Sequence, residues 1–467
     1  MKIKLFNSVN INFRKREAHT YGSPGGCGVI FRPGISSSGQ VLPGTVSKIF
    51  FDEVKIKPDS EFYKNNDETE ADEMAETIKT VTVIGAPTEL RIFQMLAHHP
   101  QRLKHGFFIG AMEQFVMSRK QLFDIVPSPP PEFFTRLAKK NVELSETVFA
   151  DLMYDASAYI MTMSDGGENL HDFINHPLIP KIPFRELVAS LLSILRGLKD
   201  LPVIHRDIKA ENVVFDPKSG RLKLIDFGLA CRPEQAFELY NNDFLKYNYP
   251  SFPPEFKVIS ALFAVIRDPR HSRRDVFRIL SNESDNFKKK LEDFVVSKVS
   301  GNIFYPGRGN LYCYTDQSFK GLRTADYLEF CHTVSADLIR QEEQDQENQG
   351  QENLEDIKQR PCDFSNDDRL ALCSQIAIFA RDSKVASVCD VYSLGLILVK
   401  LIEHHRIQFN NEHEHHENHE NHANHANHAN HEKREKRLFK IVLKMLHFNP
   451  LRRITLSTAI ELFETLH

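Results

Sequence analysis

Residues 203–230 read VIHRDIKAENVVFDPKSGRLKLIDFGLA, and this stretch decides the fold. It holds two aspartates in different settings. Asp207 lies inside the motif HRDIKAEN, in a loop that follows an apolar run with helical periodicity. Asp226 ends a stretch of alternating apolar and polar residues that is typical of a strand. Because Gly228 follows closely and glycine tolerates unusual backbone angles, we expect a sharp turn there.

The residue types in this stretch suit the transfer of a phosphoryl group. Such a transfer needs a proton acceptor for the attacking hydroxyl, oxygen ligands for magnesium and positive charge near the phosphoryl group. Asp207 would accept the proton, and Lys209 would face the phosphoryl group. Asn212 and Asp226 would hold the metal. The alternative is a surface loop and a buried strand that carry these residues by coincidence, and the order and spacing of the two motifs argue against it.

Length and composition limit the class of protein. A chain of 467 residues can bury a large core or two packed lobes, and a net charge of −4 does not indicate a nucleic-acid-binding protein. The opening residues MKIKLFNSVNINFRKRE lack the apolar run of a signal peptide. Residues 391–402, the richest apolar run, are too short to cross a bilayer. Because no apolar run is long enough, we expect no membrane insertion. Because the 7 cysteines are scattered, we expect a reducing, cytoplasmic compartment.

A glycine-rich stretch near the start, YGSPGGCGVIF from Tyr21, could bind phosphate oxygens through its backbone N–H groups. In the best alignment with GxGxxGxV, Gly25 and Gly28 take the second and third glycine positions and Ile30 takes the valine position. Ser23 then stands at the first glycine position, which is a departure. A glycine-rich hairpin without a ligand is the alternative.

A lysine and a glutamate follow on a predicted strand and a predicted helix. Lys48 lies among strand formers in TVSKIFF, residues 45–51, and a buried lysine needs a carboxylate or a phosphate to offset its desolvation. The alternative is a lysine on an edge strand. Glu89 stands near the start of the predicted helix at residues 87–96, where it either complements the helix dipole or pairs with Lys48. We favour the pair, with Phe93 one turn later facing the core.

Residues 158–163, AYIMTM, read as a buried strand that ends at SDGG. Such a strand suits a hinge whose backbone could hydrogen-bond adenine, with Met161 as gatekeeper and Met163 beside it. Residues 184–198 form a predicted amphipathic helix that leads to His205.

Four segments interrupt this order and are predicted insertions, at about residues 58–77, 101–147, 257–385 and 408–437. The first is acidic and the second contains the proline-rich run PSPPP. Within the third, the Gln/Glu/Asn tract at residues 341–355 is expected to be disordered, whereas residues 291–338 carry enough apolar side chains to fold against the body.

Residues 410–437 contain the repeat NHANHANHANH and eight histidines between His413 and His431. Histidine-rich tracts can bind zinc, nickel or copper ions. We favour a solvated loop instead, because a period of three does not keep to one helix face and no cysteine or acidic partner fixes a geometry.

In these motifs the chain resembles the eukaryotic-type protein kinase family. The resemblance covers, in order, residues 14–57, 78–100, 148–256 and 385–467. It implies an α+β, bilobal protein kinase fold, in which a small β-rich N-lobe (residues 14–162) and a larger helical C-lobe (residues 163–467), interrupted by long insertions, hold ATP between them.

The resemblance also implies cofactors, partners and a role for each motif residue. The cofactors would be ATP and Mg²⁺, with Mn²⁺ as an alternative, and the partners would be protein substrates. Asp207 would be the catalytic base, next to Lys209. ATP would be bound by Gly25, Gly28, Ile30, Lys48, Glu89, Met161 and Met163, metal by Asn212 and Asp226, and the structural positions would be His205, Arg206, Phe227, Gly228, Glu255, Asp390 and Arg453. Of these, Asp390 would brace the HRD loop, and Glu255 would pair with Arg453.

Finer features point to a subgroup. Lys209 is typical of serine/threonine kinases rather than tyrosine kinases. The PPE motif at residues 253–255, the VSKIF strand and the long insertions resemble kinases of large nucleocytoplasmic DNA viruses, which would place the protein in the host cytoplasm or the virion. There are two departures from the family pattern. Tyr392 replaces the usual tryptophan, and Asn248 stands where a threonine is usual, which bears on acceptor specificity.

Activation is expected to depend on Arg206, which in the family usually needs an anion from the segment after Gly228. Residues 229–252 contain no threonine, but Glu234, Glu238 and Asp243 offer carboxylates that could pair with the arginine. The sequence therefore predicts activity without phosphorylation.

Two other functions compete with an active protein kinase. One is a pseudokinase or scaffold whose insertions recruit protein partners, and the intact set of charged motif residues argues against it. The other is a small-molecule kinase of the aminoglycoside-kinase type. Such kinases share the Asp-to-Asn loop but lack a glycine after the metal aspartate and a PPE-like segment.

Overall fold

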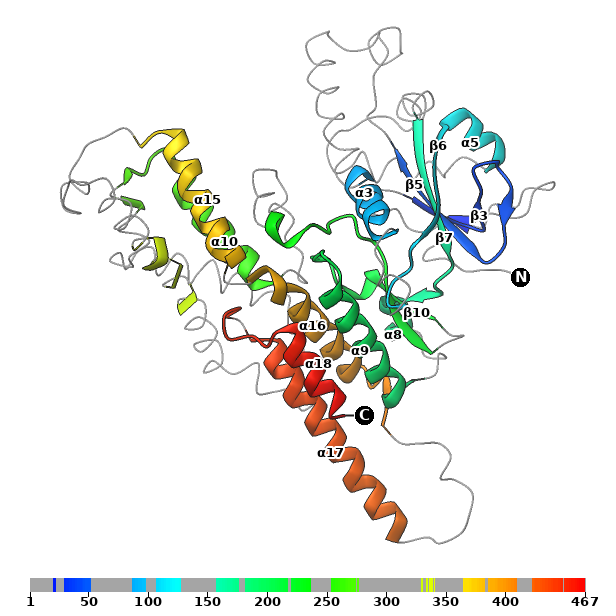
Figure 1. Cartoon of the computed structure of the whole chain (residues 1–467). Coiled ribbons are helices and arrows are strands. Elements are labelled where there is room, and N and C mark those ends of the chain that lie inside the picture. The colour runs from blue at the N-terminus through cyan, green and yellow to red at the C-terminus, as the bar shows by residue number, and fades with distance from the viewer. Residues whose placement is uncertain are drawn as a thin grey trace. The chain divides into compact units, whose positions relative to one another are not determined.

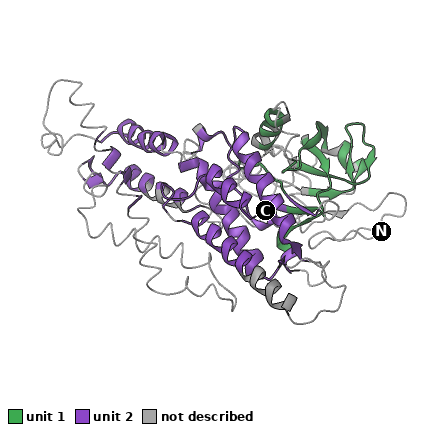
Figure 2. Ribbon diagram, turned by 60° about the horizontal axis from the view of Figure 1, so that its bottom comes forward, with its two compact units in different colours: residues 1–172, 214–219, 223–230 green, residues 173–213, 220–222, 231–467 purple. Residues whose placement is uncertain are grey.

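The computed structural model describes residues 20–21, 29–51, 86–97, 106–126, 157–175, 181–216, 220–236, 253–276, 329–340, 364–382, 385–409 and 422–466, except for single positions within the last ranges (274, 331, 332, 335, 339 and 448). The chain divides into two compact units (Figure 2). Unit 1 comprises Met1–Asp172, Val214–Ser219 and Lys223–Ala230, and unit 2 comprises Phe173–Val213, Gly220–Leu222 and Cys231–His467. As predicted, helices and strands are mixed, with the large sheet in unit 1 and most of the helices in unit 2.

Unit 1 is built on a five-stranded antiparallel sheet with the order β1-β2-β5-β7-β6 (Figure 1). Its strands, in that order, are Thr20–Tyr21, Val29–Arg32, Thr45–Phe51, Ser157–Ser164 and Ala111–Ser118. The β-branched and aromatic residues of β5 and β7 suit the half-buried surface of a sheet. A short hairpin of β3 (Gly34–Ile35) and β4 (Val41–Leu42) forms a separate sheet, and Ile35 N donates to Ser47 Oγ of β5 at 3.0 Å.

Two helices accompany this sheet. Helix α3 (Ala86–Ala97) includes residues 87–96, where the sequence predicted a helix. It buries Ile92, Phe93 and Leu96 at helical spacing. Helix α5 (Arg119–Ile125) starts with a capping box between Ser118 and Gln121. A second, three-stranded sheet has the order β11-β10-β8, formed by Arg221–Leu224, Val213–Asp216 and Glu168–Asn169.

Residues 101–147, which the sequence predicts to be an insertion, contribute a strand to the main sheet. Strand β6 lies in this range and forms one edge of the main sheet, and Phe108 makes a bridge to Leu224. This strand is hard to recognise from the sequence because an edge strand buries few of its side chains. None of the residues of β6 is fully buried, so AMEQFVMS lacks a clear alternation of apolar and polar residues.

Unit 2 is mainly helical. Its long helices are α9 (Phe184–Asp200), α10 (Pro254–Arg267), α15 (Asn366–Asp382), α16 (Cys389–Glu403), α17 (His422–Met445) and α18 (Leu456–Glu464). Helix α9 is amphipathic as predicted and packs against α18, while α16 packs against α17 (Figure 1). Strands β9 (Ile182–Pro183) and β12 (Ile407–Gln408) form a short parallel pair.

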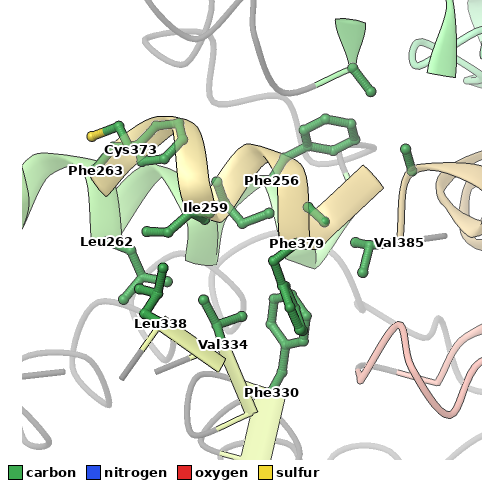
Figure 3. Close-up of a cluster of buried hydrophobic side chains, with 14 of the residues drawn as sticks. Phe256, Ile259, Leu262, Phe263, Phe330, Val334, Leu338, Cys373, Phe379 and Val385 are labelled. Atoms are coloured by element: carbon green, nitrogen blue, oxygen red, sulfur yellow. The ribbon is translucent and has the colours of Figure 1, made fainter. Parts of the chain in front are cut away.

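The predicted insertion at residues 257–385 contributes to the core of unit 2. Helix α10 begins in the PPE motif and continues to Arg267, where it packs against α15. Helices α10 and α15 share a cluster of buried hydrophobic side chains (Figure 3). Residues 329–340 contribute three fully buried side chains to this cluster, those of Phe330, Val334 and Leu338. The expectation that residues 291–338 fold against the body thus holds for the described part of them. The tract at residues 341–355 lies outside the described residues.

The prediction of a solvated loop over residues 410–437 is wrong for its second half, because α17 begins at His422. Alanine, glutamate, lysine and arginine between Ala423 and Lys440 are strong helix formers. Leu438, Ile441, Val442 and Met445 are buried at helical spacing and anchor the helix. Metal binding by the histidines of this tract was the alternative. It stays a prediction, because these histidine side chains lie outside those that the structure describes.

One segment, Val385–Glu403, is long and apolar enough to cross a membrane, whereas the sequence suggested that this apolar run was too short. Within the structure, 78% of it is buried in unit 2. A core helix passes the same test of length and composition, and the burial favours that interpretation of α16.

Candidate active site

Three residues predicted to bind ATP share one row across the main sheet. Ile30 of β2 stands directly opposite Lys48 of β5, and Lys48 stands opposite Met161 of β7. Residues that face each other across antiparallel strands project to the same side of a sheet. Met163 lies two residues further along β7, opposite Val46, and so shares this face. Sequence analysis missed Val46, although its position two residues before Lys48 was the available signal.

The lysine at the centre of this row binds two carboxylates. Lys48 Nζ donates to Glu89 Oε2 at 2.6 Å and to Asp226 Oδ1 at 2.9 Å. Strand β5 lies between β2 and β7, so Lys48 is not on an edge strand. Its side chain is 7% exposed and that of Glu89 is 1% exposed. The two carboxylates offset the cost of burying the ammonium group, as sequence analysis required.

The environment of Glu89 shifts its protonation. Burial raises the pKa of Glu89 from its ordinary value of 4.5 to about 7, and the negative charge of Asp226 adds to this effect. The charge of Lys48 and its hydrogen bond lower the pKa but do not cancel the effect of burial. The charge state of the pair is therefore sensitive to pH near neutrality.

A group of three aromatic rings holds the turn after Asp226. The Phe227 ring meets Phe93 of α3 edge-on at 5.4 Å and Phe108 at 5.5 Å between centroids. Asp226 has a positive φ of 63°, a conformation that non-glycine residues rarely adopt unless their surroundings impose it. Its Oδ1 also accepts a hydrogen bond from Gly228 N at 3.3 Å. Sequence analysis missed Phe108, and the apolar run Phe107–Ile109 was its only signal.

The glycine of the predicted hinge is tightly enclosed. A Cβ atom on Gly166 would lie 2.8 Å from Val214 Cγ2 and would also meet Ile109, so a larger residue would displace these side chains. Arg32 ties the same turn to β2, because its Nε lies 2.8 Å from Asp165 Oδ2 and its Nη2 donates to Gly167 O at 3.0 Å. Neither Arg32 nor Val214 stands in a motif, so their sequence context gave no signal.

In unit 2, the HRD loop folds around Asp207. Lys209 Nζ donates to Asp207 Oδ2 at 2.8 Å. Asn212 Nδ2 donates to the same oxygen at 2.8 Å and to the Asp207 carbonyl at 2.9 Å. The short 3-10 turn η1 (Ala210–Asn212) brings Asn212 back to the aspartate. The three residues that the HRD-to-Asn motif singled out therefore form one hydrogen-bonded group.

Asp390 holds the backbone of this loop. Its Oδ2 accepts the His205 N–H at 2.8 Å, and its Oδ1 accepts the Arg206 N–H at 2.9 Å. Burial raises the pKa of Asp390, while His205 and the two N–H bonds oppose that shift. Arg206 has a φ of 64°, and this strained conformation needs such support. The arginine's Nη1 donates to the Ala236 carbonyl at 3.3 Å.

A second buried pair joins the start of α10 to the chain after α17. Arg453 Nη1 and Nη2 donate to the two oxygens of Glu255 at 2.7 and 2.8 Å, and both side chains are fully buried. The guanidinium also donates to the carbonyls of Val388 and His447 and stacks on the Tyr392 ring at 4.8 Å. Glu255 and Arg453 thus contact each other as the resemblance implies.

Several predicted positions lie outside the described residues. They are Gly25, Gly28, Asn248, Glu238, Asp243 and the side chain of Glu234. Their contribution to phosphate binding, acceptor choice or contacts with Arg206 stays a prediction.

Comparisons with known proteins match the stretch that contains the two aspartates. Residues 134–255 match the model of the protein kinase domain family. The chain is 41% identical over 93 residues to a probable serine/threonine-protein kinase, fnkB of Dictyostelium discoideum, which covers 20% of this chain and 17% of that protein. It is 24% identical over 153 residues to serine/threonine-protein kinase 1 of African swine fever virus, covering 30% of this chain and 51% of the viral protein.

This chain resembles the eukaryotic-type serine/threonine protein kinases. A further relative, a probable serine/threonine-protein kinase YbdM of Bacillus subtilis, is 35% identical over 96 residues, which is 19% of this chain and 36% of the relative. The chain thus spans at most about half the length of these relatives. The viral relative confirms the expected resemblance to viral kinases.

The family match and the structure complement each other. The matched residues 134–255 include Asp207, Asn212 and Asp226. Lys48 and Glu89 lie before this stretch, and the structure supplies the link, because both contact each other and Lys48 contacts Asp226.

The two predicted metal ligands belong to different units, and each carries an oxygen atom of the kind that Mg²⁺ prefers. Asp226 offers a carboxylate that is 37% exposed. Asn212 uses its amide nitrogen on Asp207, and the amide oxygen is its ligand atom for a cation. Among the described residues, no group of three or more His, Cys, Asp or Glu side chains is placed to hold a metal.

Proposed function

We propose that the protein is an active protein kinase that transfers the γ-phosphoryl group of ATP to serine or threonine hydroxyls of protein substrates. The observation that carries this proposal is the contact of Lys48 with both Glu89 and Asp226. A lysine held in this way presents its charge at a fixed point, and positioned charge provides most of the catalysis in phosphoryl transfer.

Each residue of the site has a chemical task in this proposal. Lys48 neutralises phosphate oxygens of ATP, and Glu89 holds the lysine in place. Asp207 accepts the proton of the acceptor hydroxyl as the bond from its oxygen to the γ-phosphorus forms and the bond to the β–γ bridging oxygen breaks, releasing ADP. Lys209, whose Nζ lies 2.8 Å from Asp207 Oδ2, holds this carboxylate in place and faces the transferred group. When bound at Asn212 and Asp226, Mg²⁺ or Mn²⁺ would screen the negative charge of the phosphates.

Lys209 and the serine/threonine kinase relatives support these acceptors over tyrosine. A cytoplasmic location, in a host cell or virion if the protein is viral, is part of the proposal, as is the absence of nucleic-acid and membrane partners. The long insertions are proposed to contact protein partners.

The experiment that tests the proposal measures ATP-dependent labelling of a generic basic protein, with Mg²⁺ or Mn²⁺, followed by phosphoamino-acid analysis. Wild-type protein should form phosphoserine or phosphothreonine. Asp207→Asn should lower kcat by about 10³-fold with little change in the KM for ATP, because Asp207 acts on the acceptor.

The same assay separates the two alternatives. A panel of sugars and aminoglycosides serves as the second set of acceptors. A pseudokinase or scaffold would label nothing, whereas a small-molecule kinase would label the panel and leave the protein unlabelled. Either result would overturn the proposed function.

A further inference from the structure

The predicted insertion shares one hydrophobic core with residues that adjoin the catalytic loop in sequence. Three groups of buried side chains meet in this core (Figure 3), and all belong to unit 2. The first group precedes His205 or follows Gly228 and consists of Ile204, Cys231 and Ala236. The second group comes from α10. The third comes from the part of the predicted insertion that follows α10, and it includes Phe330, Val334, Leu338, Leu372, Ile376 and Phe379.

The first group is tied directly to the catalytic loop. Ile204 and Cys231 exchange two backbone hydrogen bonds, of 2.8 Å from Ile204 N and 3.0 Å from Cys231 N. Ala236 is fully buried in the core, and its carbonyl accepts the bond from Arg206 Nη1 at 3.3 Å. Arg206 adjoins Asp207 and has a positive φ, so its position depends on such contacts. The core therefore supports Ile204, which lies two residues before Arg206, and Ala236, whose carbonyl the Arg206 side chain contacts.

The inserted helix also fixes α10. Arg369 of α15 is buried and donates to the carbonyls of Ile266, Asp268 and His271, the last two at 2.9 and 2.7 Å. These carbonyls lie at and just beyond the C-terminus of α10, where a helix lacks internal donors. At the other end of α10, the Glu255–Arg453 pair holds the first turn. Helix α10 is thus anchored at both ends, and α15 of the insertion anchors its C-terminal end.

We infer that residues 268–276, 329–340 and 364–382, the described part of the predicted insertion beyond α10, are a positioning element for the transfer reaction. They hold residues 231–236 and, through Ala236, Arg206, so that the catalytic loop needs no phosphate on residues 229–252. This inference rests on the proposed function and deepens it. It adds a buried core and a backbone carbonyl to the support of Arg206, while the contacts with acidic side chains that the sequence suggested stay a prediction.

The chain offers a matched pair of valines for the test. Val334 lies in the inserted residues and Val442 lies in α17, both are fully buried in unit 2, and replacement by alanine removes the same atoms from each. We expect Val334→Ala to lower kcat for a protein acceptor by about tenfold or more, because small displacements of catalytic groups cost up to about 10²-fold. Its KM for ATP should change by less than about twofold, since Lys48, Glu89 and Asp226 belong to unit 1. Val442→Ala should leave kcat within about twofold of wild type.

Two further arms exclude a general loss of folding. Val334→Ile keeps the two γ-carbons that Val334→Ala removes and adds one methyl group, so its kcat should stay within about twofold of wild type. Should Val334→Ala fail to fold, Arg369→Met replaces it, with Arg406→Met as its control. Arg406 is likewise buried, donates to a backbone carbonyl (Phe173 O, 2.8 Å) and stacks on a phenylalanine ring. Arg369→Met should show the kcat loss and Arg406→Met should not.

The last arm treats full-length wild-type protein made in bacteria with a phosphatase and checks by mass spectrometry that residues 229–252 carry no phosphate. Its kcat should stay within about twofold. Equal kcat losses in the insertion variants and their controls would overturn this inference, and so would a loss of activity on phosphatase treatment. In either case an active wild type would leave the proposed function standing. A wild type that transfers no phosphoryl group at all would overturn both.

Discussion

Burial raises the pKa of Glu89 to about 7 although Lys48 Nζ lies only 2.6 Å away. Below this pH the carboxyl group is protonated in the folded protein, and above it the ion pair with Lys48 forms. We therefore expect kcat/KM for ATP to rise with pH through about 7, because this parameter reports ionisations of the free enzyme. The folded pKa exceeds the ordinary value of 4.5, so the contribution of Glu89 to stability is full below pH 4.5 and declines as pH rises toward 7.

The control for this prediction is Glu89→Gln, which cannot ionise. Its kcat/KM should lie below the wild-type plateau and show no inflection near neutrality. Identical pH profiles for wild type and Glu89→Gln would contradict the assigned role of this carboxyl group.

At the residue scale, sequence motifs predicted the charged groups and missed the apolar ones. Lys48, Glu89, Asp207 and Asn212 could be proposed from the sequence because the chemistry restricts both their type and their spacing. Phe108 was missed for the opposite reason, since its role depends on which rings it meets after folding, and many apolar residues would serve.

At the element scale, the buried Glu255–Arg453 pair joins α10 to the chain after α17. Removing one partner leaves a charge buried without compensation, so Arg453→Met should lower the free energy of unfolding by about 3–5 kcal/mol. The double variant Arg453→Met with Glu255→Gln should lose less than the sum of the single variants, because the second change removes the stranded charge. Urea denaturation measures all three, and additive losses would show that the pair is not coupled.

Helix α17 shows where local pattern fails. The period-three histidine repeat argued against a helix, yet buried Leu438, Ile441 and Val442 further along the chain anchor one. Lys436 lies within the stretch first predicted as a loop and is exposed. Lys436→Pro should cost about 3 kcal/mol in a helix interior and almost nothing in a loop. Lys436→Ala is the control, and equal stability of the two variants in urea would contradict the helix.

At the scale of the whole molecule, the sequence predicted two units, one with the main sheet and one mainly helical. It placed the lobe boundary at residues 162–163, which stays a prediction, while unit 1 comprises Met1–Asp172, Val214–Ser219 and Lys223–Ala230. It also missed that residues 101–147 supply β6 and that the insertion after the PPE motif shares the core of unit 2. Both errors arise because motifs report on catalytic chemistry, whereas edge strands and insertions are placed by tertiary packing.

The central claim is that this chain transfers phosphoryl groups with Asp226 as a metal carboxylate. The most direct test compares kcat of purified wild type and Asp226→Ala with ATP, Mg²⁺ and a protein acceptor, after circular dichroism has shown that both are folded. We predict that Asp226→Ala lowers kcat by about 10³-fold or more, the scale on which charge stabilisation acts in phosphoryl transfer. Near-wild-type turnover by folded Asp226→Ala would contradict the account.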